Sequence, residues 1–273
     1  MTWKLWRWVQ TPVVRHPLYQ RIVTMPQVIM PWYMGCAFIV LSPIILLPGM
    51  VFLSGVYGIR WAVQIAGSIA YERENGMYEL LVLTPAGRIG INRAIMSANL
   101  FRNESFEQLQ SLGAWVIRGF FTLTLMMIAT STMGIINPVD GESALAQVVV
   151  PLYLVTMGAA IYIDHVQSIV LAVVVGMLVP TFTTRRIDAG AAALILYLVC
   201  QVCTYVLTLL IGFNIAPYWL EGMGVSAMTQ ALILPFIRLV VFAASREGCI
   251  YYFWRVIVRE MNTTPSEVQI MTH

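Results

Sequence analysis

Residues 71–85 of the chain read Tyr-Glu-Arg-Glu-Asn-Gly-Met-Tyr-Glu-Leu-Leu-Val-Leu-Thr-Pro. They follow a long apolar run, and the charges at 72–74 are typical of the point where a membrane helix reaches water. The Asn75-Gly76 pair tolerates the left-handed backbone that ends a helix. The apolar segment Met77–Leu83 is then expected to form a short helix at the membrane surface, stopped by Thr84-Pro85. Such a helix needs a cover of lipid, of the chain itself or of a partner protein.

The pattern Glu-Arg-x-x-Gly-x-x-Glu-Leu-Leu-x-x-Thr-Pro in this stretch resembles the signature loop of type-2 ABC exporter permeases. Met77 stands where that family usually has Thr. The resemblance implies a loop between the second and third spans that docks on an ATPase subunit. The alternative is an ordinary amphipathic loop of another membrane protein. The matching positions are Glu72, Arg73, Gly76, Glu79, Leu80, Leu81, Thr84 and Pro85.

The same resemblance assigns roles to the charges of this loop. It implies that Glu72, Glu74 and Glu79 are docking contacts for the ATPase. Arg73 would be their salt link, either within the chain or to the partner. These roles are mechanical, and they require no catalytic residue in this chain.

Composition defines the class of protein. The chain has 273 residues, of which 59% are hydrophobic and 11% charged. Soluble domains carry about 25% charged residues. We therefore expect an all-α integral membrane protein with one membrane domain, and no nucleic-acid partner is indicated. Cys200 and Cys203 form a CxxC pair inside an apolar segment, which favours two small core residues over a metal or redox site.

Hydropathy and charge predict the order of the segments along the chain. A span needs about 20 residues, so the first apolar block is expected to hold two short spans with a turn at Leu47-Pro48-Gly49. The predicted segments are an interfacial amphipathic helix (2–22, broken at Pro12 and Pro17), spans 1 and 2 (32–70), a cytoplasmic coupling region (71–112, with a surface helix at 88–100), span 3 (113–136), span 4 (144–182), span 5 (189–213), a loop (214–224), span 6 (225–245) and a cytoplasmic tail (246–273).

The positions of the arginines favour about six spans with both termini in the cytoplasm. If segment 144–182 crosses the membrane once, Arg185, Arg186 and Arg246 lie inside, and the outer turns hold no Lys or Arg. That segment is longer than a single span. The extra residues near Asp164-His165 are therefore expected to form a re-entrant, interfacial or broken segment.

Four polar side chains fall inside predicted spans: Arg60, Asp164, His165 and Arg238. A charge at mid-span costs about 2.5 to 3.5 kcal/mol on insertion scales, so Arg60 should have a partner, and Asp164 is a candidate. Arg238 could extend toward the interface. Asp164-His165 could couple to protons, or His165 could bind a pigment or haem. A structural pair or an interfacial position is the favoured interpretation for each.

Several catalytic chemistries lack their motifs. A P-loop requires a lysine after its glycines, but the chain has one lysine, Lys4, with no glycine before it. HExxH and GxSxG are also missing. We therefore do not expect an enzyme or a metal site; ATP would be bound by a partner subunit.

The leading hypothesis is a permease subunit of an ABC exporter in the cell membrane, in contact with lipid. It would pair with a second permease, as a homodimer or heterodimer, and with ABC ATPase subunits. The alternative is a non-transporting accessory subunit of a larger membrane complex, one that could contain pigment or cofactor. A membrane-embedded enzyme is a less favoured third interpretation. Neither the substrate nor the direction of transport follows from the sequence.

Overall fold

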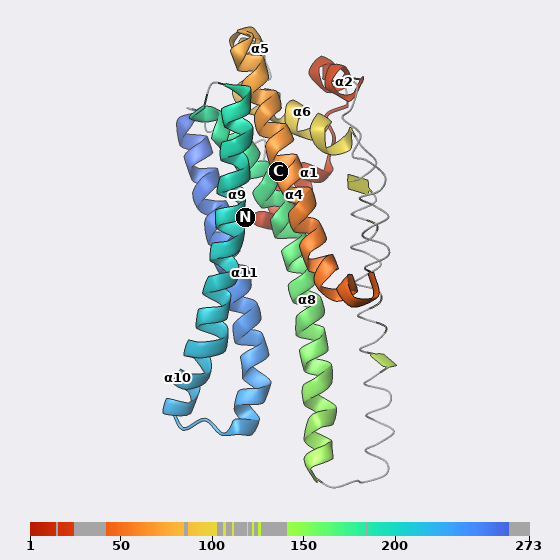
Figure 1. Cartoon of the computed structure of the whole chain (residues 1–273), viewed down its shortest axis with the longest axis vertical. Helices are drawn as coiled ribbons and strands as arrows, with labels where there is room; N and C mark the ends of the chain where they lie inside the picture. Colours follow the sequence, from red (N-terminus) through yellow and green to blue (C-terminus); the bar gives the residue numbers. More distant parts are fainter. Residues whose placement is uncertain are drawn as a thin grey trace. The chain divides into compact units, whose positions relative to one another are not determined.

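The structure is a computed structural model (Figure 1), and it is helical, with no strand among the residues that it describes. This confirms the all-α prediction. The chain forms two compact units: unit 1 contains 1–107, 165–201 and 247–273, and unit 2 contains 108–164 and 202–246. The described residues are 1–14, 16–24, 42–84, 87–102, 106–107, 111, 119, 122, 125–126, 141–183 and 185–261, with backbone alone in 42–53 and 141–147.

Three helical stretches are long and apolar enough to cross a membrane, namely Val148–Thr181, Arg186–Gly222 and Ala227–Glu260. They support the prediction of a membrane protein. The first belongs to α8 (Gly141–Leu178) and its 3-10 extension η1 (Val179–Thr181). The second is α9 (Arg186–Leu209) with η2 (Leu210–Ile215) and α10 (Ala216–Gly222), and the third is α11 (Ala227–Glu260). Predicted span 3 lies almost entirely outside the described residues.

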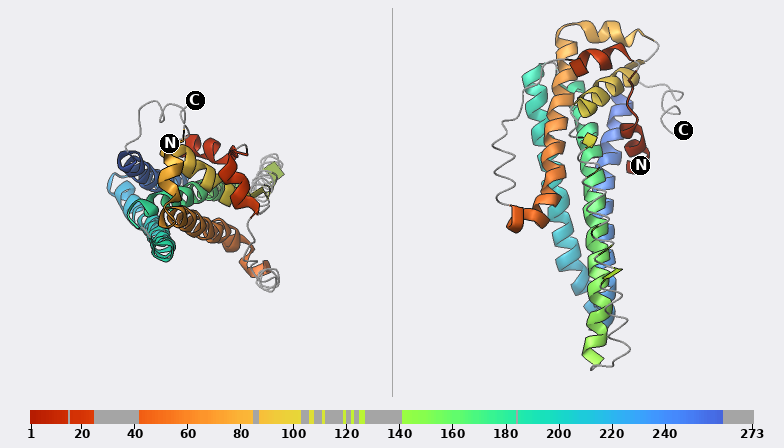
Figure 2. Two further views of the ribbon diagram at one scale, coloured as in Figure 1. Left: turned by 90° about the horizontal axis from the view of Figure 1, so that it is seen from above. Right: turned by 90° about the vertical axis from the view of Figure 1, so that its right-hand side faces the viewer.

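Unit 1 holds the amino-terminal helices and the segment quoted first. Its elements are α1 (Thr2–Gln10), α2 (Pro17–Thr24), α4 (Ser42–Glu74), α5 (Met77–Val82) and α6 (Gly87–Phe101), with parts of α8, α9 and α11. Helix α6 packs against α2, α4 and α5. Figure 2 shows α5 following the carboxyl end of α4. The predicted surface helix at 88–100 is therefore present as α6, but most of its side chains are buried within unit 1.

The amino-terminal helix is broken near Pro12 and Pro17, as predicted, but its tryptophans differ from the expectation. Trp6 and Trp8 are buried, and Trp8 meets the ring of Trp254 edge-on at 6.0 Å between centroids. The Thr2 amide and hydroxyl both donate to the Glu247 carboxylate. Helix α1 thus buries its aromatic face against the chain instead of lipid headgroups, and Trp3 is the tryptophan of this helix that stays exposed.

Two predicted interruptions, at 47–49 and at 164–165, have helical backbone. Helix α4 includes the expected turn at 47–49, and Figure 2 shows a sharp bend near its amino-terminal end. Helix α8 is unbroken at Asp164-His165, so its extra length extends one helix without a re-entrant segment. At about 1.5 Å per residue its 38 residues reach about 57 Å, well beyond a hydrocarbon core of about 30 Å. Continuous helix satisfies every backbone polar group internally, which an apolar environment requires.

The predicted loop at 214–224 is helical as far as Gly222, and only the following residues form the turn. The loop was expected because Pro217, Trp219 and Glu221 together are typical of an interface. Pro217 lies in the first turn of α10, where its missing N–H is not needed. The π-helical segment η2 joins α10 to α9 without a break. The last helix, α11, likewise continues past the predicted boundary at 245 to Glu260, and 262–273 lie outside the described residues.

Unit 2 includes a small apolar cluster of Ala216, Leu220 and Leu234. The π-helical segment η2 provides the partner of Arg238, one of the four polar residues predicted inside spans. Arg238 Nε donates to the Gly212 carbonyl at 3.1 Å, and its guanidinium lies 3.9 Å from the centroid of the Phe213 ring. A π-helical turn alters the i→i−4 ladder and leaves such a carbonyl accessible. Arg238 is therefore held by the neighbouring helix within unit 2.

Candidate functional site

The turn before α5 has the backbone that the Asn75-Gly76 pair predicts. Gly76 has φ +69°, in the left-handed region, and its amide donates to the Arg73 carbonyl at 3.0 Å. Helix α5 then begins at Met77 and ends at Val82, one residue before the predicted end. The Thr84 hydroxyl and amide both donate to the Leu81 carbonyl and close the helix. Pro85 lies outside the described residues.

One face of α5 is apolar and exposed. Leu80 is 65% exposed and Leu83, just past the helix, is 83% exposed. Met77 and Glu79 are also exposed, whereas Leu81 is half-buried. Residues three apart share one side of a helix, so Met77, Leu80 and Leu83 form a bare apolar ridge. Among the described residues of unit 1, nothing covers this ridge.

The opposite side of α5 is fixed to unit 1 by Tyr78, which is 1% exposed. Its hydroxyl donates to Asn92 Oδ1 on α6 at 3.1 Å. The Arg73 guanidinium lies 4.6 Å from the centroid of the Tyr78 ring, and its Nη1 donates to the Pro180 carbonyl of η1. Arg73 and Tyr78 therefore connect α5 with the end of α4, with α6 and with η1 after α8.

The two glutamates before the turn differ in their burial and in their partners. Glu72 is 3% exposed and faces Arg21 of α2, with 3.8 Å between Oε1 and Nη1. Glu72 is thus buried in this structure, whereas the resemblance places it on the docking surface, and its docking role stays a prediction. Glu74 is exposed and accepts a hydrogen bond from the Arg186 amide at 3.4 Å. Arg73 binds a carbonyl and a ring instead of forming a carboxylate salt link among the described residues.

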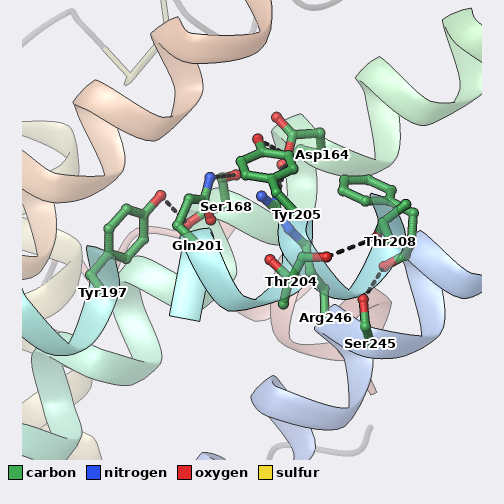
Figure 3. A network of polar contacts seen from close by, with 10 residues as sticks. Asp164, Ser168, Tyr197, Gln201, Thr204, Tyr205, Thr208, Ser245 and Arg246 are labelled. Atoms are coloured by element: carbon green, nitrogen blue, oxygen red, sulfur yellow. Dashed lines mark hydrogen bonds and ion pairs between the residues drawn. The ribbon is translucent and has the colours of Figure 1, made fainter. Parts of the chain in front are cut away.

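Asp164 of α8 forms an ion pair with Arg246 of α11 in unit 2, and not with Arg60 as predicted (Figure 3). The Tyr205 hydroxyl donates to Asp164 Oδ1 at 3.0 Å, and the guanidinium of Arg246 lies 5.1 Å from the centroid of the Tyr205 ring. Arg246 was not predicted as this partner, because it was expected at the start of a cytoplasmic tail. Its position 82 residues from Asp164 gave no local signal.

The remaining predicted residues lie in unit 1. Arg60 lines a cavity beside α4, which is described below. His165 is half-buried, and its ring lies edge-on to Trp6 with 6.3 Å between centroids. Figure 3 also draws Tyr197 and Gln201 of α9, which donate to the Ser168 carbonyl and hydroxyl respectively. In the described parts of the chain, no three His, Cys, Asp or Glu side chains are grouped as metal ligands would be.

No family model, curated protein or solved structure matches this chain. Residues 71–85 and the geometry around α5 are therefore the features of the chain that point to a function.

Proposed function

We propose that this chain is the membrane-spanning permease subunit of an ATP-driven ABC exporter. In this proposal a separate ATPase subunit hydrolyses ATP, and a second permease completes the transport path. The proposal is supported above all by the ridge of Met77, Leu80 and Leu83 on a short helix outside the predicted spans. A coupling helix needs an exposed surface for the motor protein and a firm connection to the spans.

The connection is provided by the other face of α5. Tyr78 binds α6, and Arg73 joins its ring to η1 at the end of α8. A displacement of α5 would therefore move three elements together. The left-handed turn at Gly76 and the closing bonds of Thr84 give the short helix two fixed ends. The amino-terminal helices would support this region from within the chain, since Arg21 of α2 faces Glu72 of α4.

Purification in mild detergent from the native membrane tests the proposal. We expect a polypeptide with a P-loop to co-purify and its ATP hydrolysis to increase in the complex. Leu80→Asp should abolish this association, because it puts a charge at the centre of the ridge. The control is Val14→Asp, since Val14 is also apolar and exposed (53%) but lies outside α5.

Two results would contradict the proposal. One is a purified complex without any nucleotide-binding protein, which would favour an accessory subunit of a larger membrane assembly. The other is equal ATPase recovery with wild type and Leu80→Asp. Equal loss with Leu80→Asp and Val14→Asp would show a general effect of added charge, and the ridge would then have no special part in binding.

A further inference from the structure

Unit 1 contains an open cavity of about 1110 Å³ bounded by α4, the end of α6 and the start of α9. Along α4 its lining residues recur every three or four positions, which places them on one helix face. From Arg60 to Glu74 this face extends about 21 Å along the axis, at about 1.5 Å per residue. The α4 side of the lining includes Arg60, Gln64, Gly67, Ser68, Tyr71 and Glu74.

The cavity carries an excess of positive charge. Four arginines line it, Arg60, Arg102, Arg185 and Arg186, against two acids, Glu74 and Asp188. Among the described residues, no carboxylate forms an ion pair with Arg60, Arg185 or Arg186. Glu74 accepts a hydrogen bond from the backbone of Arg186 instead. A cavity with low-dielectric walls and one sign of charge concentrates ions of the opposite sign.

Arg60 lies on α4, 14 residues before Glu74, and lines the cavity without a carboxylate partner among the described residues. Neutral polar groups also line the cavity. Asn99 Nδ2 donates to Ser68 Oγ at 3.2 Å, and the amide of Gln64 lies one turn from Arg60 on the same face. An anion in the cavity would be attracted by the arginines and could accept hydrogen bonds from the neutral polar side chains.

The lining also indicates the chemical class of the anion. Guanidinium groups bind phosphate through two parallel hydrogen bonds, and the positive end of the α9 dipole favours negative charge at Arg185–Asp188. Beside the arginines, Val63, Ala191 and Leu194 add an apolar wall, and Ile187 at the opening is 84% exposed. The cavity can therefore hold a phosphate together with a hydrocarbon group.

We propose that this cavity is a binding site for a phosphate ester, with its phosphate at the arginines and its apolar part along Val63 and Leu194. Either an anionic phospholipid or a soluble phosphate ester could supply that chemistry. The site is independent of the proposed export function, because it needs only α4, α6 and α9 of unit 1.

Native mass spectrometry of the delipidated full-length protein tests the site. With added dioleoyl phosphatidylglycerol we expect one tightly bound molecule per chain, and weaker binding of the zwitterionic dioleoyl phosphatidylcholine. Arg60→Gln and Arg186→Gln should each weaken phosphatidylglycerol binding about tenfold, since each removes a charged hydrogen-bond donor. Arg255→Gln is the matched control: Arg255 is exposed on α11 near Tyr251 and does not line the cavity.

A second arm distinguishes the two sources of phosphate. If glycerol 3-phosphate displaces the lipid and raises the melting temperature of the protein, the ligand is a soluble ester; if only the lipid binds, it is a phospholipid. The proposal is overturned if the two lipids bind equally, or if both cavity variants bind phosphatidylglycerol like wild type. Arg186 is exposed, so Arg186→Gln should fold, and its affinity for phosphatidylglycerol tests the site even if Arg60→Gln fails to fold.

Discussion

Arg246 Nη1 lies 2.5 Å from Asp164 Oδ1, and both side chains are almost fully buried in unit 2. The same nitrogen donates to the Asp164 backbone carbonyl at 3.2 Å. Arg246 also lies over the rings of Tyr205 and Phe242. In an apolar environment these contacts hold the α8 segment and the α11 segment of unit 2 in one register, because a shift of either helix would separate the charges.

This ion pair predicts a strongly non-additive effect of mutation. Arg246→Leu and Asp164→Leu should each destabilise the protein by about 3 to 5 kcal/mol, since each leaves a buried charge without its partner. The double variant should lose less than the sum, because two apolar side chains replace the pair. Equilibrium unfolding of the four proteins in detergent measures the coupling. Additive losses would show that the two charges do not stabilise each other.

A close helix contact in unit 1 predicts the effect of one added methyl group. A Cβ on Gly176 of α8 would lie 2.9 Å from Ile65 Cβ and 3.1 Å from the Ala62 carbonyl oxygen. Neither α4 atom can move away easily, so Gly176→Ala should cost about 1 to 3 kcal/mol through overpacking. Gly248→Ala is the control, because its Cβ would meet nothing within 4 Å. Equal thermal stability of the two variants would mean that α4 and α8 are not tightly packed at Gly176.

At the turn before α5, the effect of backbone strain can be tested separately from side-chain packing. A Cβ on Gly76 would meet nothing within 4 Å, yet the residue has φ +69°. Gly76→Ala should therefore lose about 1 to 2 kcal/mol from backbone strain alone. We expect the loss to be local, as faster hydrogen exchange of the α5 amides with little change in the rest of unit 1. Gly76→Asn should restore part of the protection, because Asn tolerates this backbone better than Ala. Protection that is the same in all three proteins would contradict the assigned turn.

Local sequence signals predicted the elements around the coupling region. Asn75-Gly76 indicated the turn, and the apolar run after it indicated the short helix, because both depend on neighbouring residues. Proline was less reliable. Pro217 was interpreted as part of a loop, but it lies in the first turn of α10, where a helix tolerates proline. The turn predicted at Pro48 has helical backbone, and Figure 2 shows α4 sharply bent near its amino-terminal end.

The partners of charged residues could not be predicted in the same way. Asp164 was a candidate partner for Arg60 because both were expected inside the membrane, but the choice of partner depends on how distant helices pack. Glu72 was expected to be a docking contact because the loop resembles the signature loop of ABC exporter permeases. Its burial against Arg21 depends on the position of α2, about 50 residues away in the chain, which no local pattern records.

The two faces of α5 allow binding and transmission to be separated under the proposed function. Leu80→Asp changes only an exposed residue and should abolish association with the ATPase. Tyr78→Phe keeps the ring under Arg73 but removes the hydroxyl that donates to Asn92. The loss of one hydrogen bond costs about 0.5 to 1.5 kcal/mol and leaves the exposed ridge unchanged.

We therefore expect Tyr78→Phe to bind the ATPase normally and to reduce its stimulation several-fold. Titration of the purified ATPase with each permease variant, with ATP hydrolysis measured at saturation, distinguishes the two effects. If Tyr78→Phe gives full stimulation at saturation, Tyr78 and Asn92 do not transmit the motion, and α5 serves only as a binding surface.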